Sequence, residues 1–218
     1  MTQATYAVYG ASGCGRSIMP IARQMLITQG ISLEQLYFID DQPTQDKING
    51  QVVVRYNDFL KIPADQRYVV IAIANSQIRA KLAAKLTEHD IHAWTIQSAQ
   101  TLIMDQVELA EGAALSPFVT LTSNIKIGKH FHANLYSYVE HDCIIGDFVT
   151  FAPRVSCNGN VIIEDHAYIG TGAVIKQGTP DKPLIIGRGA VVGMGAVVTK
   201  SVPAGVTVVG NPARSFVK

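Results

Sequence analysis

The chain has 218 residues, which is enough for one large domain or two small ones. Lys and Arg total 18 and Asp and Glu total 17, so the formal net charge of +1 gives no basic excess that would favour nucleic acid or an anionic membrane surface. Charged residues make up 16% and the mean hydropathy is +0.19, yet no apolar run reaches the length of about 18 residues that a membrane-spanning helix needs. The composition predicts a folded core of regularly spaced aliphatic side chains.

The cysteines and the N-terminus indicate the compartment. Three cysteines are present, Cys14, Cys143 and Cys157, and no CxxC pair occurs, which argues against a disulfide framework or a zinc ribbon. Residues 1–5 show no basic region followed by an apolar stretch, so we see no signal peptide. We therefore expect a reducing cytoplasm.

The first hundred residues have the pattern of a small α/β unit. Three apolar segments are predicted as strands: 6–9, 36–39 and 68–73. The first runs into the glycine-rich turn 10–15, which is followed by a predicted helix over 16–28. A second helix is expected over 76–89, with Ser76 as its N-cap. Alternating strands and helices predict a parallel, Rossmann-like sheet over residues 1–100.

From Leu109 onward the period changes to six residues. An inward-facing apolar residue is predicted at every sixth position through Ile175 and a second, mostly small one four positions after each; the first positions are Leu109, Leu115, Leu121, Ile127, Ala133, Val139, Ile145, Phe151, Cys157, Ile163, Ile169 and Ile175. The register breaks at 179–183 and resumes at Ile186, so five residues are inserted, and we expect them to form a surface loop. A six-residue period predicts a hexapeptide β-helix over 101–218, with three hexads in each coil and about five coils spaced roughly 4.8 Å apart.

These hexads resemble those of the hexapeptide-repeat acyltransferases, whose fold is a left-handed β-helix. The turn 10–15, Asp40-Asp41 and the segment 71–76 are similar to the bacterial nucleotide-amino-sugar N-acetyltransferases, especially the PglD-like enzymes that acetylate a UDP-4-amino-4,6-dideoxy sugar on the bacillosamine pathway. The resemblance implies acetyl-CoA as co-substrate, a homotrimer with shared sites, and no metal or redox cofactor. It also implies a product that enters a surface glycan such as lipopolysaccharide O-antigen.

The nucleotide is expected at the glycine-rich turn. A turn of this kind lets the backbone approach a phosphate, and the helix that follows it favours anions at its N-terminus. The spacing here is GxxGxG rather than GxGxxG, so a dinucleotide is only weakly indicated. By resemblance the UDP moiety is lined by Ser12, Gly13, Cys14, Asp40, Asp41, Ala74 and Asn75, although the PglD-like enzymes have His in place of Cys14.

Six histidines are present, and His141 is the catalytic candidate among them. His130, His132, His141 and His166 avoid the inward positions, so all four are expected to point outward, with His130 and His132 exposed. The segment 139–148 looks like the active-site hexads of the PglD-like enzymes, in which His is the general base and the acidic residue after it, here Asp142, modulates it. An imidazole suits this task because an amine must lose a proton before it attacks a thioester near neutral pH.

The resemblance assigns further contacts to acetyl-CoA and the sugar. The backbone N–H of Gly159 is implied as the oxyanion donor, and Thr150 lies where the PglD-like enzymes have a second His near the thioester. Thr171 and Gly193 match the region along which pantetheine lies, and Asn134 matches a sugar contact from the adjacent subunit.

Three alternatives compete with this prediction. A zinc carbonic anhydrase of the same solenoid fold needs two histidines five positions apart, which this chain lacks. The acceptor can instead be a dTDP- or GDP-linked amino sugar, or the hydroxyl group of a sialic acid. A non-catalytic solenoid is disfavoured by the His141-Asp142 pair.

Overall fold

The computed structural model describes residues 4–216 and divides the chain into two compact units, Met1–Ser98 and Ala99–Lys218. The elements of the first unit are β1 (Ala4–Tyr9), α1 (Gly13–Thr28), the short 3-10 helix η1 (Leu33–Gln35), β2 (Leu36–Ile39), β3 (Lys47–Ile48), β4 (Gln51–Val54), α2 (Tyr56–Phe59), β5 (Gln66–Ile71), α3 (Ser76–Glu88), β6 (His92–Ala93) and β7 (Ile96–Gln97). Within the described residues no helix is both long and apolar enough to span a bilayer.

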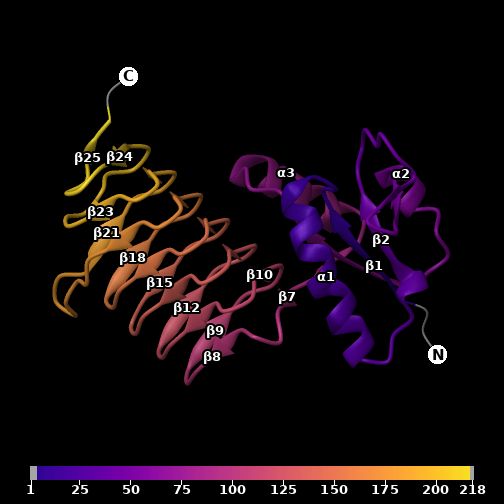
Figure 1. The fold of residues 1–218 in the computed structure, drawn as a ribbon, viewed down its shortest axis with the longest axis horizontal. Coiled ribbons are helices and arrows are strands. Elements are labelled where there is room, and N and C mark those ends of the chain that lie inside the picture. The colour runs from indigo at the N-terminus through magenta and orange to yellow at the C-terminus, as the bar shows by residue number, and fades with distance from the viewer. Residues whose placement is uncertain (1–3, 217–218) are drawn as a thin grey trace. The chain divides into compact units, whose positions relative to one another are not determined.

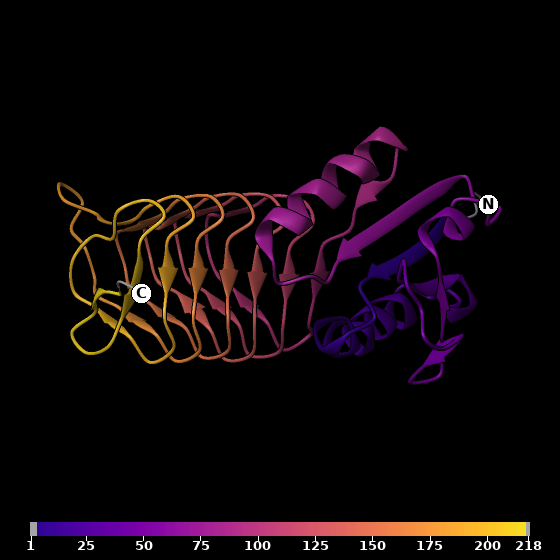
Figure 2. The same cartoon turned by 90° about the horizontal axis from the view of Figure 1, so that it is seen from above.

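The first unit is built on a sheet in the order β3-β4-β2-β1-β5-β6, in which only β3 and β4 pair antiparallel. Tyr9 lies opposite Ile39 and Ile71, so the three central strands end at the same edge. Helices cover both faces of the sheet (Figure 2): α1 lies on one face, and α2 and α3 lie on the other with the cluster that contains Phe59 and Leu86. This arrangement confirms the Rossmann-like prediction.

One cap in this unit differs from the prediction. The structure assigns the N-cap of α3 to Asn75, whose side-chain oxygen accepts from the N–H groups of Gln77 and Ile78 at 3.0 Å each. Ser76 is instead the first helical residue, because Asn75 precedes it in extended conformation and already satisfies the free N–H groups of the first turn.

The second unit is the predicted β-helix, and Figure 1 shows its coils stacked as flat rungs. Its strands are β8 (Leu102–Ile103), β9 (Val107–Leu109), β10 (Ala114–Leu115), β11 (Thr120–Leu121), β12 (Ile125–Ile127), β13 (His132–Ala133), β14 (Tyr138–Val139), β15 (Ile144–Ile145), β16 (Thr150–Phe151), β17 (Ser156–Cys157), β18 (Val161–Ile163), β19 (Tyr168–Ile169), β20 (Val174–Ile175), β21 (Leu184–Ile186), β22 (Val191–Val192), β23 (Val197–Val198), β24 (Thr207–Val209) and β25 (Arg214–Ser215).

Three parallel sheets form the sides of this left-handed β-helix. We call them side C (β10, β13, β16, β19, β22, β24), side D (β8, β11, β14, β17, β20, β23) and side E (β9, β12, β15, β18, β21). From Leu115 onward every predicted first position is buried, and so are the second positions, which confirms the hexad register. Thr179, the second-position residue of the twelfth hexad, is the exception. It is exposed because the inserted loop begins there.

The hexad register begins earlier than Leu109, the first position that the sequence pattern identified, but within the range 101–218 predicted for the β-helix. Strands β8 and β9 pair with β11 and β12, so Ile103 and Val107 already belong to the solenoid and pack against its core. The fourth residue of each hexad has a positive φ angle, between +53° and +63° at the non-glycine corners from Phe118 to His166. These left-handed residues turn the chain from one side to the next at every corner.

Candidate active site

His141 and Asp142 form the corner between β14 on side D and β15 on side E. Asp142 has φ +58°, and its carboxylate Oδ2 lies 2.7 Å from Nδ1 of the preceding ring. Both side chains are about half exposed, 45% for His141 and 49% for Asp142. The hydrogen bond to Asp142 raises the pKa of His141 above its ordinary value, and the negative charges of Asp142 and Glu140 act in the same direction.

Gly159 occupies the same corner one coil further along the solenoid. A Cβ atom at this position would lie 2.6 Å from Cε1 and 2.7 Å from Nε2 of His141, so the imidazole lies directly against the glycine backbone. Only a residue without a side chain leaves room for the ring there. The structure therefore brings together the three residues expected at the reaction centre: His141, Asp142 and Gly159.

The Gly159 N–H makes no hydrogen bond to the described part of the chain. The equivalent N–H groups at the corner between sides E and C are capped by carboxylates of the next coil: Lys129 N–H donates to Asp147 Oδ1 at 2.7 Å, and Asp147 N–H donates to Asp165 Oδ1 at 2.9 Å. The corner at Gly159 thus combines a titratable base with an amide donor that remains available to a ligand. Such a pair can deprotonate a nucleophile and stabilise an oxyanion.

The residues predicted to bind the nucleotide gather at the carboxyl edge of the first unit's sheet. Ser12, Gly13 and Cys14 follow β1, Asp40 and Asp41 follow β2, and Ala74 and Asn75 follow β5. Several of their polar groups already have partners inside the chain. Tyr9 donates its hydroxyl to Asp41 Oδ2 at 2.6 Å, Gln42 N–H donates to Asp40 Oδ1 at 2.9 Å, and Asn75 Oδ1 caps α3.

Arg79 is a residue at this edge that the sequence reading missed. Its wholly buried side chain donates to the carbonyl groups of Ile73 and Ala74 at 2.7 and 3.1 Å, which holds the loop after β5. Burial lowers the pKa of Arg79 to about 10 and raises the pKa of Cys14, whose thiol lies within its electrostatic influence. Nothing in the sequence around a basic residue on a predicted helix indicates that its side chain is buried. No local signal therefore pointed to Arg79.

The residues predicted around acetyl-CoA do not all lie at the His141 corner. Thr150 is buried on β16 of side C, and Thr171 and Gly193 lie at the corner between sides C and D. Asn134 lies after β13, and its Nδ2 donates to the carbonyl of Phe151 at 2.8 Å, which leaves its side-chain oxygen for a ligand. The prediction that one site contains them all stays a prediction.

The expectation that His130 and His132 are exposed is wrong, since they are 4% and 3% exposed. Outward positions stack in register along a solenoid, so each ring lies between its neighbours in the adjacent coils. His130 stacks on Phe148 with ring centroids 5.1 Å apart, and His132 lies between Ala114 and Thr150. Over residues 4–216 no three His, Cys, Asp or Glu side chains are grouped so as to hold a metal ion.

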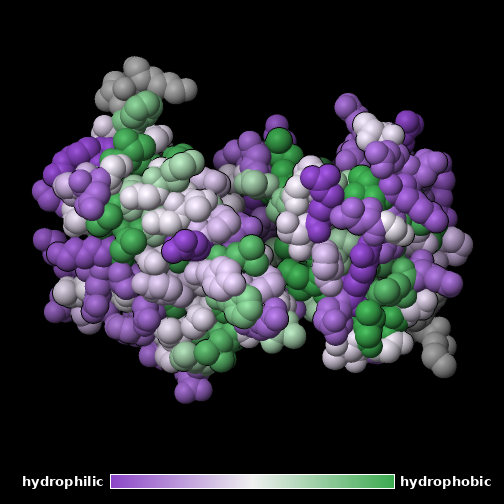
Figure 3. Space-filling model, in the orientation of Figure 1, coloured by the Kyte–Doolittle hydropathy of each residue, from purple (hydrophilic) through white to green (hydrophobic). Residues whose placement is uncertain are grey.

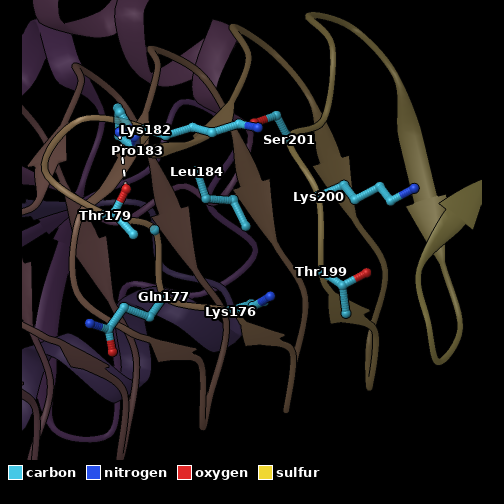
Figure 4. A pocket seen from close by; sticks show the side chains of 10 residues that line it. Lys176, Gln177, Thr179, Lys182, Pro183, Leu184, Thr199, Lys200 and Ser201 are labelled. Carbon is cyan, nitrogen blue, oxygen red and sulfur yellow. Dashed lines mark hydrogen bonds between the residues drawn. The ribbon is translucent and has the colours of Figure 1, made fainter.

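The inserted loop builds a basic pocket that the sequence reading also missed. Thr179 and Lys182 exchange backbone hydrogen bonds at 3.0 Å across the neck of the loop. Lys182 N–H also lies 3.1 Å from Thr179 Oγ1, the contact drawn in Figure 4. A cavity of about 500 Å³ is lined there by Lys176, Gln177, Gly178, Thr179, Lys182, Pro183, Leu184, Thr199, Lys200 and Ser201. The lining has three lysines and no acidic residue, and the Gly178 N–H donates to the Gly159 carbonyl at 3.0 Å. The pocket therefore begins one coil beyond Gly159 and two coils beyond His141, and it suits phosphate groups.

Comparison with known proteins adds independent findings. Residues 6–86 match the family model described as the PglD N-terminal domain. The GDP-perosamine N-acetyltransferase of Escherichia coli O157:H7 is 52% identical over 211 residues, 97% of this chain and 96% of that protein. The solved structure of WeeI from Acinetobacter baumannii AYE is 62% identical, with a TM-score of 0.95 over 98% of this chain and 100% of that one. The acetyltransferase domain of PglB from Neisseria gonorrhoeae FA1090, solved with acetyl coenzyme A, is 24% identical with a TM-score of 0.83 over 99% of this chain and 100% of that one, and it shares the fold.

Proposed function

Because this chain belongs to the nucleotide-amino-sugar N-acetyltransferases of the hexapeptide-repeat family, which use acetyl-CoA, we propose that its acceptor is the amino group of a GDP-linked 4-amino-4,6-dideoxy sugar. The sequence alone favoured a UDP-linked sugar and kept GDP as an alternative. The 52% identity to a GDP-perosamine N-acetyltransferase over nearly the whole chain favours that alternative.

The observation that carries the chemistry is the His141 ring, which is held by Asp142 and lies against Gly159. Nδ1 is engaged by the carboxylate, so Nε2 is the nitrogen that accepts a proton from the attacking amine. The amine then forms a bond to the thioester carbon while the carbonyl oxygen takes up negative charge, which the Gly159 N–H stabilises. When the carbon–sulfur bond breaks, the proton on Nε2 passes to the departing thiolate, and the base is regenerated.

Asp142 supports this cycle because it raises the pKa of His141. A more basic imidazole takes the proton of an amine more readily, provided that the pH keeps the ring neutral before the reaction. The carboxylate also stabilises the imidazolium that forms and keeps the ring in one tautomer.

The basic pocket extends the proposal to the other end of acetyl-CoA. Its three lysines, Lys176, Lys182 and Lys200, lie along the same D–E corner in the two coils beyond Gly159, and no carboxylate lines the cavity with them. We assign them to the phosphate groups of the coenzyme, and we assign the carboxyl edge of the first unit's sheet to the nucleotide of the amino sugar.

We also propose a homotrimer with shared sites, which the placement of the predicted residues supports. His141 and Gly159 lie at the corner between sides D and E, whereas Thr171 and Gly193 lie at the corner between sides C and D. Apolar side chains also remain uncovered on the solenoid, among them Ile144 at 49% and Met194 at 81% exposure, and Figure 3 shows hydrophobic residues interrupting the polar surface over the coils. Packing the D–E corner of one chain against the C–D corner of the next would cover such residues and bring both sets together. A fully active monomer in sedimentation would contradict this arrangement.

The acceptor is tested with a panel of GDP-, UDP- and dTDP-linked 4-amino-4,6-dideoxy sugars together with a free sialic acid. Release of the CoA thiol from acetyl-CoA is recorded for the wild type and for His141→Ala. We expect the highest kcat/KM with the GDP-linked amine and a loss of about 10²-fold or more in His141→Ala. Preference for a UDP-linked amine would overturn the choice of nucleotide, and preference for the hydroxyl acceptor would overturn N-acetylation. We propose the cytoplasm as the compartment of the enzyme.

A further inference from the structure

Two wholly buried thiols lie behind the corner that carries His141 and Gly159, and the proposed reaction uses neither of them. Cys143 Sγ lies 3.3 Å from the carbonyl oxygen of Asn158 and 3.6 Å from that of His141. Cys157 Sγ lies 3.8 Å from the same Asn158 oxygen. A thiol has one proton to donate, and the shortest of these contacts joins Cys143 to Asn158.

The Asn158 carbonyl and the Gly159 N–H belong to the same peptide group. This peptide is trans, so its carbonyl and its N–H point in opposite directions across a rigid plane. The Cys143 side chain lies in the core, so the Asn158 carbonyl that accepts from it points inward. The Gly159 N–H then points outward, to the corner where the His141 ring lies. The orientation of the proposed oxyanion donor is therefore set from behind by the thiol.

In the preceding hexad a serine hydroxyl makes the equivalent hydrogen bond to a carbonyl of the next coil. Ser137 is the equivalent second-position residue, and its Oγ donates to the carbonyl of Ala152 at 3.0 Å and accepts from Val155 N–H at 3.1 Å. The Ala152 carbonyl belongs to the peptide group between Ala152 and Pro153, and a proline has no N–H that such a contact could orient.

Cys143 repeats both contacts six residues later. Its Sγ lies 3.3 Å from the Asn158 oxygen, and hydrogen bonds to it from the Cys157 thiol and the Val161 N–H lower the pKa of Cys143. The peptide held in this case ends in the N–H of Gly159. The Ser137 geometry also shows that a serine hydroxyl at this position can reach the carbonyl of the next coil.

We propose that Cys143 is a positioning residue for acetyl transfer, whose thiol hydrogen bond to the Asn158 carbonyl aims the Gly159 N–H at the thioester oxygen. The inference rests on the proposed function, in which that N–H stabilises the oxyanion. A hydrogen bond to a carbonyl also polarises the amide, so the thiol strengthens the N–H as a donor in addition to orienting it.

The test compares Cys143→Val, Cys143→Ala and Cys143→Ser with the matched control Cys157→Val. Val and Ala fill the equivalent position in other hexads, for example Val149 and Ala167, so both variants suit the solenoid while removing the donor. We expect kcat to fall about fivefold in Cys143→Val and Cys143→Ala, the worth of one neutral hydrogen bond, with both KM values unchanged. Cys143→Ser and Cys157→Val should keep the wild-type kcat.

A second readout separates action through Gly159 from action through His141, whose carbonyl also lies near the thiol. The acidic limb of the kcat–pH profile reports the His141 pKa, and we expect it to stay in place in Cys143→Val. A shifted limb, an unchanged kcat in Cys143→Val and Cys143→Ala, or an equal loss in Cys143→Ser would each overturn the proposal.

A third readout does not depend on activity. In ¹³C,¹⁵N-labelled protein, the Asn158 carbonyl and Gly159 amide resonances should move in Cys143→Val and stay near their wild-type positions in Cys157→Val. Resonances that ignore the loss of the Cys143 thiol would overturn the proposed hydrogen bond. If the wild type instead releases no CoA with any acceptor, the proposed function fails, while the resonances still decide whether the thiol holds the peptide.

Discussion

A single methyl group at Gly159 should disable the reaction centre by displacing the His141 ring. The new Cβ in Gly159→Ala would lie 2.6 Å from Cε1 and 2.7 Å from Nε2, whereas nonbonded carbon atoms prefer a separation of about 3.5 Å or more. The ring must therefore retreat by about 1 Å. The φ angle of Gly159 lies outside the left-handed region, so alanine adds no backbone strain of its own.

The size of the effect follows from this displacement. A reacting group misplaced by about 1 Å can cost about 10²-fold in rate, so we expect a loss of kcat of this order. The shift also disturbs the 2.7 Å contact between His141 Nδ1 and Asp142 Oδ2, so the pKa of His141 should fall back toward its ordinary value.

The assay is initial-rate release of CoA at saturating concentrations of both substrates, combined with thermal unfolding as a check on folding. His141→Ala and the double variant His141→Ala/Gly159→Ala complete a double-mutant cycle. With the imidazole gone the methyl group has nothing to displace, so the second substitution should cost little. A Gly159→Ala enzyme with wild-type kcat, or an equal loss in the His141→Ala background, would refute displacement of the ring as the cause.

Three further predictions follow from the described contacts. Asp142→Asn removes the carboxylate that raises the pKa of His141. Because the base must be neutral to accept a proton, the acidic limb of the kcat–pH profile should move to lower pH. An acidic limb that does not move would contradict the assigned cause of the raised pKa. Lys176→Ala, Lys182→Ala and Lys200→Ala should each raise the KM for acetyl-CoA by about threefold to tenfold and leave the KM for the amino sugar unchanged. Initial rates at fixed ionic strength measure both constants. A change confined to the KM for the amino sugar would place the coenzyme phosphates elsewhere. Phe131→Ala removes a wholly buried ring that packs edge-on against Phe151, with the ring centroids 5.2 Å apart. Denaturant titration should show a loss of about 3–5 kcal/mol in the free energy of unfolding. A loss well below about 1 kcal/mol would mean that the coil collapses to fill the space.

The features predicted well from sequence are those with a local physical cause. The six-residue spacing specifies which side chains enter the β-helix, because each side of a coil places the same hexad positions inside. The apolar segment 36–39 coincides with β2, and the two acidic residues after it lie at the carboxyl edge of a parallel sheet, as strand order requires. The break in register at 179–183 correctly indicated a loop outside the solenoid.

Predictions failed where two neighbouring positions were equally suitable or where coils stack. Asn75 and Ser76 are both good N-caps, and only the backbone conformation shows which of them precedes the first helical turn. His130 and His132 point outward by their hexad position, yet the side chains stacked above and below cover them. The first hexad position was set too late at Leu109, because partly buried Ile103 and Val107 continue the register toward the start of the predicted range 101–218.

The sequence by itself determined the two-part fold and the hexad register, and it supplied His141-Asp142 as the candidate base and its partner, since periodicity and residue chemistry are local properties. The tertiary structure decided what meets across coils: the His141 ring against Gly159, the Cys143 thiol on the Asn158 carbonyl, and three lysines around one cavity. His141 and Gly159 are 18 positions apart, Cys143 and Asn158 are 15 apart, and Lys176 and Lys200 are 24 apart, and the stacking of successive coils brings each pair to one site.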